Sequence, residues 1–334
     1  MKKAFLGLTA LIGVGVMVAS GPVKIDPKLQ PYVTDQKVAG DLRTAGSDTM
    51  GNLMSLYAQA FNKVHPGVRI QVESKGSSTG PAALLESQGQ FAAMSRPMSS
   101  KEIDQFVKKF GHAPTELRVG IDCLAVYVNK DCPLEEISIP QLRRVFSVDG
   151  PDMRWSDLGV THPQWADRPI SLHSRNAASG TYGFFKTVAL GGADFKSTVK
   201  EAPGSAGVVG AVATDPLAMG YSGIGYSTPD VKALRVSFED GEPGAEPTQE
   251  AANYGDYPIA RNLYVYVNYD RQAGLDTLRA EFIRLMFSRE GQEAVVKDGY
   301  FPVSAKIAAE DLAKVGLMLL PAKKKDVVDA DGDS

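Results

Sequence analysis

Two long strand-like runs read LRVGIDCLAVYVN (residues 117–129) and IARNLYVYVN (residues 259–268). Each is rich enough in apolar and β-branched side chains to pass through a protein core, and each ends at a polar turn. The chain between the two runs carries strand and helix patterns of its own. A chain that enters a second lobe along one strand and leaves it along another joins two lobes through two hinges. We therefore predict one lobe from residues 38–119 and 260–320, a second lobe from residues 120–259, and hinges at 117–122 and 257–262.

Shorter strand and helix patterns alternate through both predicted lobes. Residues 68–72 alternate apolar and polar side chains, as a half-buried strand does. The preceding residues 50–65 carry apolar side chains at helical spacing until Pro66 and Gly67 end the helix. This alternation is typical of an α/β fold with largely parallel sheets. Further helices are predicted at 80–88, 99–110, 140–147, 180–190, 206–213 and 275–298, further strands at 169–173 and 220–226, and a polar surface excursion at 236–256.

The 334 residues include 36 Lys and Arg, 39 Asp and Glu, four His and two Cys. That length suits about two α/β domains. A nucleic-acid-binding protein normally has a basic surface, which the near-neutral charge balance argues against. The histidines, at 65, 112, 162 and 173, lack the spacing of metal ligands, and two cysteines are too few for a zinc ribbon or an iron–sulfur centre. We therefore expect no nucleic-acid partner, no metal and no cofactor.

The first 20 residues have the pattern of a secretory signal peptide. The chain starts with Met1-Lys2-Lys3, continues with the almost wholly apolar residues 4–18, and then reaches small residues. The apolar run is shorter than the ~20 residues of a membrane span, which argues against a retained anchor. We predict cleavage near Ser20 and export to the periplasm, an oxidising compartment. At the other end, residues 321–334 are predicted to form a flexible tail.

The two cysteines, Cys123 and Cys132, flank the strand-like residues 124–129. A disulfide suits an oxidising compartment, although spacing in the sequence does not establish that the two Cα atoms approach closely enough. We predict a structural disulfide between them. Two free, buried thiols are the alternative.

One kind of loop, rich in Gly and hydroxyl residues, occurs three times before a helix pattern. It reads GSDT at 46–49, GSSTG at 76–80 and SRNAASGT at 174–181. Glycine lets the backbone approach a ligand, and the free N–H groups of a first helical turn favour negative charge. Ser, Thr and Asp are also ordinary helix N-caps, so one such loop alone indicates little. Three together, one with the planar donor fork of Arg175, favour an anion site, and none has the spacing or the Lys of a nucleotide P-loop.

These loops and three further motifs resemble the family of periplasmic phosphate-binding proteins of phosphate ABC transporters. The further motifs read FAAMSRPM at 91–98, GYSGIGY at 220–226 and YPIARNLY at 257–264. The resemblance implies the two-lobe fold of the type II periplasmic binding proteins, with two hinge crossover strands. It further implies a monomer that captures inorganic phosphate between its lobes and delivers it to an inner-membrane ABC permease.

Transferred position by position, the resemblance places phosphate contacts on both predicted lobes. The sequence departs from the family twice, because many members have Asp where Arg96 stands and an acid where Ala177 stands. The implied contacts are Ser47, Asp48, Thr49, Ser78, Ser95, Arg96, Arg175, Ser179, Gly180 and Thr181.

The two departures leave Asp48 as the candidate proton acceptor. Phosphate near neutral pH keeps one or two protons and sulfate keeps none, so a buried carboxylate can accept a hydrogen bond only from phosphate. A site built around such a hydrogen bond can reject the analogue that lacks it by roughly 10⁴-fold. Arg96 and Arg175 would balance the charges of Asp48 and the ligand. The alternatives are an N-cap role for Asp48 and a structural ion pair for Arg96.

Two other functions stay open at this point. A receptor for sulfate or molybdate would use similar helix ends, because a fold alone does not name its ligand. A serine esterase would use Ser78, because GSSTG matches the G-x-S-x-G of a nucleophile elbow. However, the last His is His173, which leaves no late His for a catalytic triad. We therefore predict a binding protein and not an enzyme.

Overall fold

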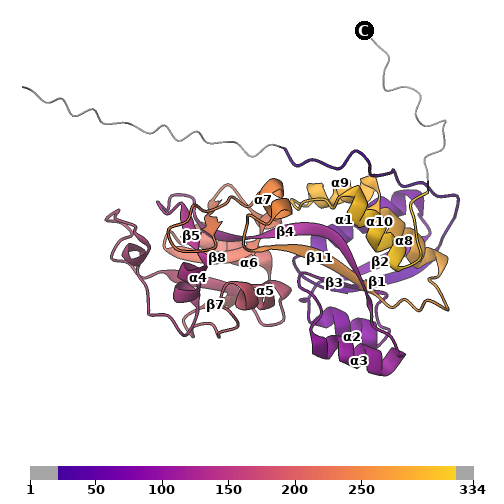
Figure 1. Cartoon of the computed structure of the whole chain (residues 1–334), viewed down its shortest axis with the longest axis horizontal. Coiled ribbons are helices and arrows are strands. Elements are labelled where there is room, and N and C mark those ends of the chain that lie inside the picture. Colours follow the sequence, from indigo (N-terminus) through magenta and orange to yellow (C-terminus); the bar gives the residue numbers. More distant parts are fainter. Residues whose placement is uncertain (1–21, 321–334) are drawn as a thin grey trace, which may run out of the picture.

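Two α/β lobes lie side by side, and two long strands cross from one to the other (Figure 1). The computed structural model describes residues 22–320. The crossing strands are β4 (Thr115–Asn129) and β11 (Ala260–Val267), which pair antiparallel from Thr115 opposite Val267 to Cys123 opposite Ala260. They coincide with the two strand-like runs of the sequence.

The first lobe is built from chain segments that lie before and after the second lobe in the sequence. Its core of buried apolar side chains unites residues 29–119 with residues 263–315. In that core Phe282 packs against Phe61 and Phe91, with ring centroids 5.2 and 5.4 Å apart. Its elements are β1 (Gly40–Gly46), α1 (Gly51–Val64), β2 (Val68–Glu73), α2 (Thr79–Leu85), β3 (Phe91–Met94), α3 (Ser100–Phe110), α8 (Thr277–Phe287), α9 (Arg289–Lys297) and α10 (Ala305–Lys314).

The second lobe has a separate core, formed within residues 123–259 together with Phe301. Its centre is a stack of Phe185 on Tyr221, with ring centroids 3.8 Å apart. Its elements are β5 (Glu136–Ser138), α4 (Ile139–Phe146), η1 (Trp155–Leu158), β6 (Ser171–Arg175), α5 (Gly180–Val188), β7 (Lys200–Ala202), α6 (Ser205–Thr214), β8 (Ala218–Gly223), η2 (Ile224–Tyr226), β9 (Val231–Ala233), β10 (Arg235–Ser237) and α7 (Gln249–Tyr254).

One nine-stranded sheet runs through both lobes in the order β2-β1-β3-β11-β4-β8-β6-β7, with β9 also paired to β4. Away from the two crossing strands the pairs β1–β2, β1–β3, β6–β7 and β6–β8 are all parallel. Loops that follow the carboxyl ends of parallel strands are the usual place for a ligand in such sheets. The predicted α/β fold with two crossover strands is confirmed.

One prediction of local structure was wrong, and a second left out regular elements. The single helix predicted at 275–298 is two helices, because Ser288 ends α8 and caps α9 by accepting a hydrogen bond from the Gly291 amide at 3.2 Å. The predicted surface excursion at 236–256 includes part of β10 and all of α7. Strand β10 pairs in parallel with β5 to form a separate two-stranded sheet.

The predicted disulfide is also wrong, because Cys123 and Cys132 are both buried and free. Cys123 lies within β4, and the strand remains extended as far as Asn129. A strand advances about 3.3 Å per residue, so Asn129 lies on the order of 20 Å beyond Cys123 before the chain turns. A disulfide needs Cα atoms within about 7 Å of each other.

The amino-terminal part of the described chain runs along both lobes, on the edge of the molecule that carries α7 and α9 (Figure 1). Lys24 exchanges two hydrogen bonds of 2.8 Å with the Gln249 side chain on α7. Asp26 accepts a hydrogen bond from the Ala305 amide at 2.9 Å, and Leu29 is buried in the first core. The predicted signal peptide (1–20) and tail (321–334) lie outside the described residues. Between residues 22 and 320 no helix is long and apolar enough to cross a membrane.

The first Gly- and hydroxyl-rich loop depends on a glycine conformation, and this generates a prediction. Gly46 ends β1 with φ +136°, and a Cβ there would lie 2.0 Å from the Ala93 carbonyl oxygen. We expect Gly46→Ala to lower the free energy of unfolding by about 3 kcal/mol or more. The matched control is Gly111→Ala, where φ is +80° and the space is open, so the loss should be about 1 kcal/mol. Urea unfolding measures both, and equal losses would contradict the prediction.

Candidate anion-binding site

The three Gly- and hydroxyl-rich loops meet between the lobes. They follow the carboxyl ends of β1, β2 and β6 and lead into α1, α2 and α5. Thr49 and Thr181 approach each other to 2.9 Å through their Oγ1 atoms, and the Ser78 amide donates to the Ala178 carbonyl at 3.2 Å. Hydrogen bonds of this length between the lobes define a closed arrangement.

Buried hydroxyl groups occupy the centre of this contact. Ser47 Oγ donates to Ser95 Oγ at 2.9 Å, and Ser77 Oγ lies 3.2 Å from the same atom. The Ser95 amide donates to Ser77 Oγ at 3.1 Å, so the hydroxyl proton of Ser77 remains available for another acceptor. We call the following residues, each at most 2% exposed, the hydroxyl cluster: Ser47, Thr49, Ser77, Ser95 and Thr181.

The second loop contributes Ser77 to the cluster, whereas the family resemblance implies Ser78. Ser78 is exposed, and its Oγ donates to the Ala178 carbonyl at 3.1 Å. Ser77 is wholly buried against Ser95. Two adjacent serines before a helix are equivalent in a sequence, because only the direction of the chain as it enters the helix decides which hydroxyl turns inward.

Arg175 is a fully buried guanidinium at the end of β6. Its Nη1 donates to Ser205 Oγ at 2.6 Å, and its Nη2 donates to the Pro203 carbonyl at 2.9 Å. Its Nε–H is buried and has no partner among residues 22–320. Burial lowers the pKa of Arg175, and the nearby Asp48 carboxylate opposes that shift. A buried N–H without an acceptor is costly, so Arg175 is suited to receive an anion.

Asp48 reaches from the first lobe to the second. Its Oδ2 accepts a hydrogen bond from the Ser205 amide at 2.9 Å, at the start of α6, and lies 3.2 Å from Arg175 Nη1. A carboxylate is stabilised at a helix amino terminus by the helix dipole. Asp48 therefore joins the lobes and partly neutralises Arg175. No hydrogen bond within the described chain engages its Oδ1.

A second buried guanidinium, which the sequence motifs did not indicate as a site residue, adjoins the cluster. Arg261 of β11 lies directly opposite Asp122 of β4, and its Nη2 and Nε donate to Asp122 Oδ2 at 2.7 and 3.0 Å. Arg261 also donates to the Ser95 carbonyl and to Thr181 Oγ1, each at 2.9 Å. The available signal was an acidic residue, Asp122, and a basic residue, Arg261, within the two mostly apolar strand runs.

Arg96 does not join the cluster through its guanidinium. Its two Nη atoms donate to the two carboxylate oxygens of Glu102, each at 2.8 Å. Glu102 in turn accepts a hydrogen bond from the Ser99 amide at 2.7 Å and completes the amino-terminal cap of α3. Arg96 thus makes the structural ion pair that was the alternative to a ligand contact.

The start of α5 supplies the remaining predicted residues. Ser179 caps the helix by accepting a hydrogen bond from the Thr181 amide at 3.1 Å. Gly180 allows close approach of the lobes, because a Cβ there would lie 2.3 Å from Ser77 Oγ and 2.6 Å from Ser95 Oγ. The hydroxyl cluster therefore faces the amino terminus of a helix, which favours an anion.

The structure provides no catalytic partner for Ser78 in the described part of the chain. His65 lies 2.8 Å from Tyr32 Oη, His173 lies 3.3 Å from Ser171 Oγ, and neither hydrogen-bonds Ser78. His112 and His162 hydrogen-bond backbone groups of their own neighbourhoods. Residues 22–320 contain no group of three or more His, Cys, Asp and Glu side chains placed to hold a metal ion.

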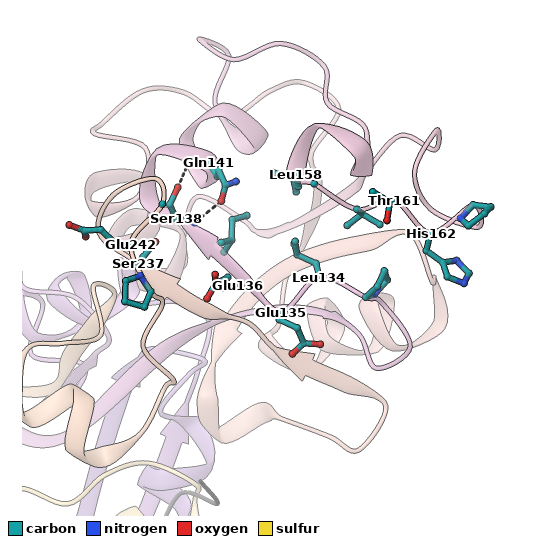
Figure 2. A pocket seen from close by; sticks show the side chains of 17 residues that line it. Leu134, Glu135, Glu136, Ser138, Gln141, Leu158, Thr161, His162, Ser237 and Glu242 are labelled. Atoms are coloured by element: carbon teal, nitrogen blue, oxygen red, sulfur yellow. Dashed lines mark hydrogen bonds between the residues drawn. The ribbon is translucent and has the colours of Figure 1, made fainter. Parts of the chain in front are cut away.

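A large hollow of about 880 Å³ lies elsewhere, in the second lobe (Figure 2). Glu135, Glu136 and Glu242 lie around it, with Leu134 and Leu158. None of the predicted site residues lines it. Acidic and apolar walls do not suit an anion, so we place the candidate site at the hydroxyl cluster.

The fold and the buried donors between the lobes define a two-lobed binding protein, and a family model described as the PBP superfamily domain matches residues 33–290. The phosphate-binding protein PstS of Pseudomonas aeruginosa is 41% identical over 95% of this chain and 99% of its own length. The protein of that name from Bacillus subtilis is 30% identical over 81% of this chain and 83% of its own. The chain belongs to the family of the phosphate-binding protein PstS.

Solved structures share the fold at lower identity. A Clostridium perfringens structure with bound phosphate aligns with a TM-score of 0.68 and 23% identity, over 79% of this chain and all of that chain. An ABC-type phosphate transport receptor from Vibrio cholerae aligns with a TM-score of 0.61 and 22% identity, over 78% and 100%. The two-lobe architecture is therefore the one that these structures have.

Asp298, at the end of α9, gives a prediction for pH dependence. Its Oδ1 accepts a hydrogen bond from Asn52, but its Oδ2 is buried without a partner among the described residues. Burial, with a smaller contribution from the Asp122 charge, raises the pKa of Asp298 to about 6. A raised carboxyl pKa stabilises the fold below the unfolded pKa, and that contribution is lost as the pH rises through about 6.

We therefore expect Asp298→Asn to raise the free energy of unfolding by about 2 kcal/mol at pH 7.5, with the gain vanishing near pH 4. Exposed Asp104 on α3 gives the control Asp104→Asn, which should change little at either pH. Denaturant unfolding at the two pH values measures the difference. A variant of Asp298 no more stable than the wild type at pH 7.5 would contradict the assignment.

Proposed function

We propose that the protein captures inorganic phosphate in the hydroxyl cluster and delivers it to an ABC permease of the inner membrane. The observation that carries the proposal is the buried Arg175 Nε–H, which has no partner among residues 22–320. Its guanidinium pairs with Asp48, the residue between Ser47 and Thr49 of the hydroxyl cluster. The name shared by the relatives and the phosphate in the Clostridium perfringens structure support phosphate as the anion. The protein acts by binding, without a chemical step, as a monomer in the periplasm after cleavage near Ser20.

The lobes would move as two bodies about the crossing strands, with the boundaries 38–119 plus 260–320 and 120–259. Ser47, Thr49 and Ser77 would meet phosphate on the first lobe, and Arg175 and Thr181 would close over it from the second. A ligand favours the closed form only through contacts that it makes there. A permease can then recognise the closed lobes.

Asp48 is the acidic group that we propose as the proton acceptor. Its Oδ2 is engaged by the Ser205 amide and Arg175, which leaves Oδ1 for a P–OH group. The carboxylate is thus held by the second lobe at the same time as it reads the ligand's proton. Sulfate has no proton at neutral pH, so a sulfate oxygen and Asp48 Oδ1 would face each other as two hydrogen-bond acceptors.

Titration calorimetry of ligand-stripped protein tests the proposal. Phosphate should bind one-to-one, and sulfate at the same concentration should give no binding heat. Comparable binding of both would make the protein a general oxyanion receptor and remove the role of Asp48. Absence of binding by folded, ligand-stripped protein would refute the proposed function.

A variant that obstructs closure shows whether the cluster is the site. Gly180→Ala would place a methyl group 2.3 Å from Ser77 Oγ on the opposite lobe, so phosphate affinity should fall at least tenfold. Gly180 is the first residue of α5 and is not among the glycines with positive φ, so the second lobe itself should stay stable. The control is Gly210→Ala in α6, where a Cβ meets nothing within 4 Å and the affinity should not change. Wild-type affinity in the Gly180 variant would place the anion elsewhere.

A further inference from the structure

We infer that the Arg261–Asp122 ion pair on the crossing strands is a positioning element of the phosphate site, which fixes the Thr181 hydroxyl as a donor and ties it to the closed form. The inference rests on the proposed function. The pair comes from β11 and β4, neither of which belongs to the three loops that the sequence indicated. It would make the hinge strands themselves part of ligand recognition.

The pair sits where the two strands cross between the lobes. Arg261 and Asp122 are directly opposed in the antiparallel register, and their side chains are 1% and 0% exposed. Asp122 Oδ1 also accepts a hydrogen bond from the Ile224 amide at 3.0 Å, which attaches the carboxylate to the second lobe. A buried pair with its remaining positions satisfied holds its geometry firmly, although it adds little net stability.

Arg261 determines the direction of the hydrogen bonds around it. A guanidinium has donors only, so Thr181 Oγ1, 2.9 Å away, must act as the acceptor of that bond. The Thr181 proton is then free to be donated, either to Thr49 Oγ1 at 2.9 Å or to an anion oxygen. The Ser95 amide likewise makes Ser77 Oγ an acceptor, which leaves the Ser77 hydroxyl proton free to be donated. The hydroxyls of Thr181 and Ser77 can therefore both donate to an anion.

The same guanidinium contacts both lobes. Nη1 donates to the Ser95 carbonyl of the first lobe, and Nη2 donates to Thr181 of the second, each at 2.9 Å. The guanidinium carbon also lies 5.5 Å from the ring centroid of Phe184 on α5. Separation of the lobes would break one set of these contacts. The complete set of contacts, from Ser95 through Arg261 to Thr181, therefore exists only in the closed form, which couples recognition to closure.

Asp122 neutralises the positive charge of Arg261 and so limits how Arg261 acts on an anion. An unpaired Arg would attract any anion through its charge, whereas Asp122 neutralises Arg261 and leaves its directed hydrogen bonds. The unbalanced attraction for the ligand then comes from Arg175, whose Nε has no partner in the described chain and whose neighbour Asp48 is 26% exposed. The two guanidiniums thus have different roles, one binding and one positioning.

A double-mutant cycle between the ion pair and Thr181 tests the inference. Arg261→Met alone would leave Asp122 charged and buried, so the test combines Arg261→Met with Asp122→Asn, which keeps an acceptor for Ile224. We expect the paired variant to lose about 30-fold in phosphate affinity, as Thr181→Val should, and the triple variant to lose little more than either. Thermal unfolding first shows whether the wild type, the paired variant, Thr181→Val and the triple variant are each folded. Calorimetry with inorganic phosphate then measures the affinity of all four proteins.

A partly buried ion pair of the first lobe supplies the control. Arg118 Nη2 lies 2.7 Å from Asp311 Oδ1, on β4 and α10, and contacts no member of the hydroxyl cluster. Arg118→Met with Asp311→Asn should lower the unfolding temperature and leave phosphate affinity unchanged. Additive losses, or wild-type affinity in a folded Arg261 and Asp122 variant, would overturn the inference alone. Failure of the wild type to bind phosphate would instead overturn the proposed function, and this inference with it.

Discussion

The antiparallel pairing of β4 with β11 is the constraint on which the rest of the structure depends. The two strands lie in the middle of one sheet that serves both lobes, so each lobe builds its own parallel strands outward from a shared pair. That arrangement turns the carboxyl ends of β1, β2 and β6 toward one place, although β6 lies far from the other two in the sequence. The loops at those ends face each other because the crossing strands fix the separation of the lobes.

Burial of charge explains why the contact between the lobes is an anion site. The contact between the lobes contains two guanidiniums, Arg175 and Arg261, and two carboxylates, Asp48 and Asp122. Hydroxyl groups in the same contact have protons left to donate. Buried hydrogen-bond donors that lack acceptors cost free energy until a ligand that carries acceptors binds. An anion supplies acceptors without bringing a donor that needs its own partner, apart from a P–OH group for which Asp48 retains an oxygen.

The sequence predicted the features that are repeated or local, and the structure was needed for those that depend on direction. Strand runs, the three loops and the inward placement of Thr49, Ser95, Arg175 and Thr181 followed from pattern and resemblance. Ser78 was predicted as a contact in place of Ser77, because a sequence does not distinguish an inward-facing from an outward-facing serine before a helix. Arg261 and Asp122 were missed because their pairing depends on strand register across 139 positions. The disulfide failed because strand extension carries Cys132 away from Cys123.

The most direct test of the central claim is a crystal structure of the protein grown with phosphate. The account predicts a phosphate oxygen within hydrogen-bond distance of Arg175 Nε, with Ser77 and Thr181 donating to the same anion and the Arg261–Asp122 pair intact behind Thr181. Phosphate bound in the acidic hollow of the second lobe, or at the exposed Ser78, would contradict it.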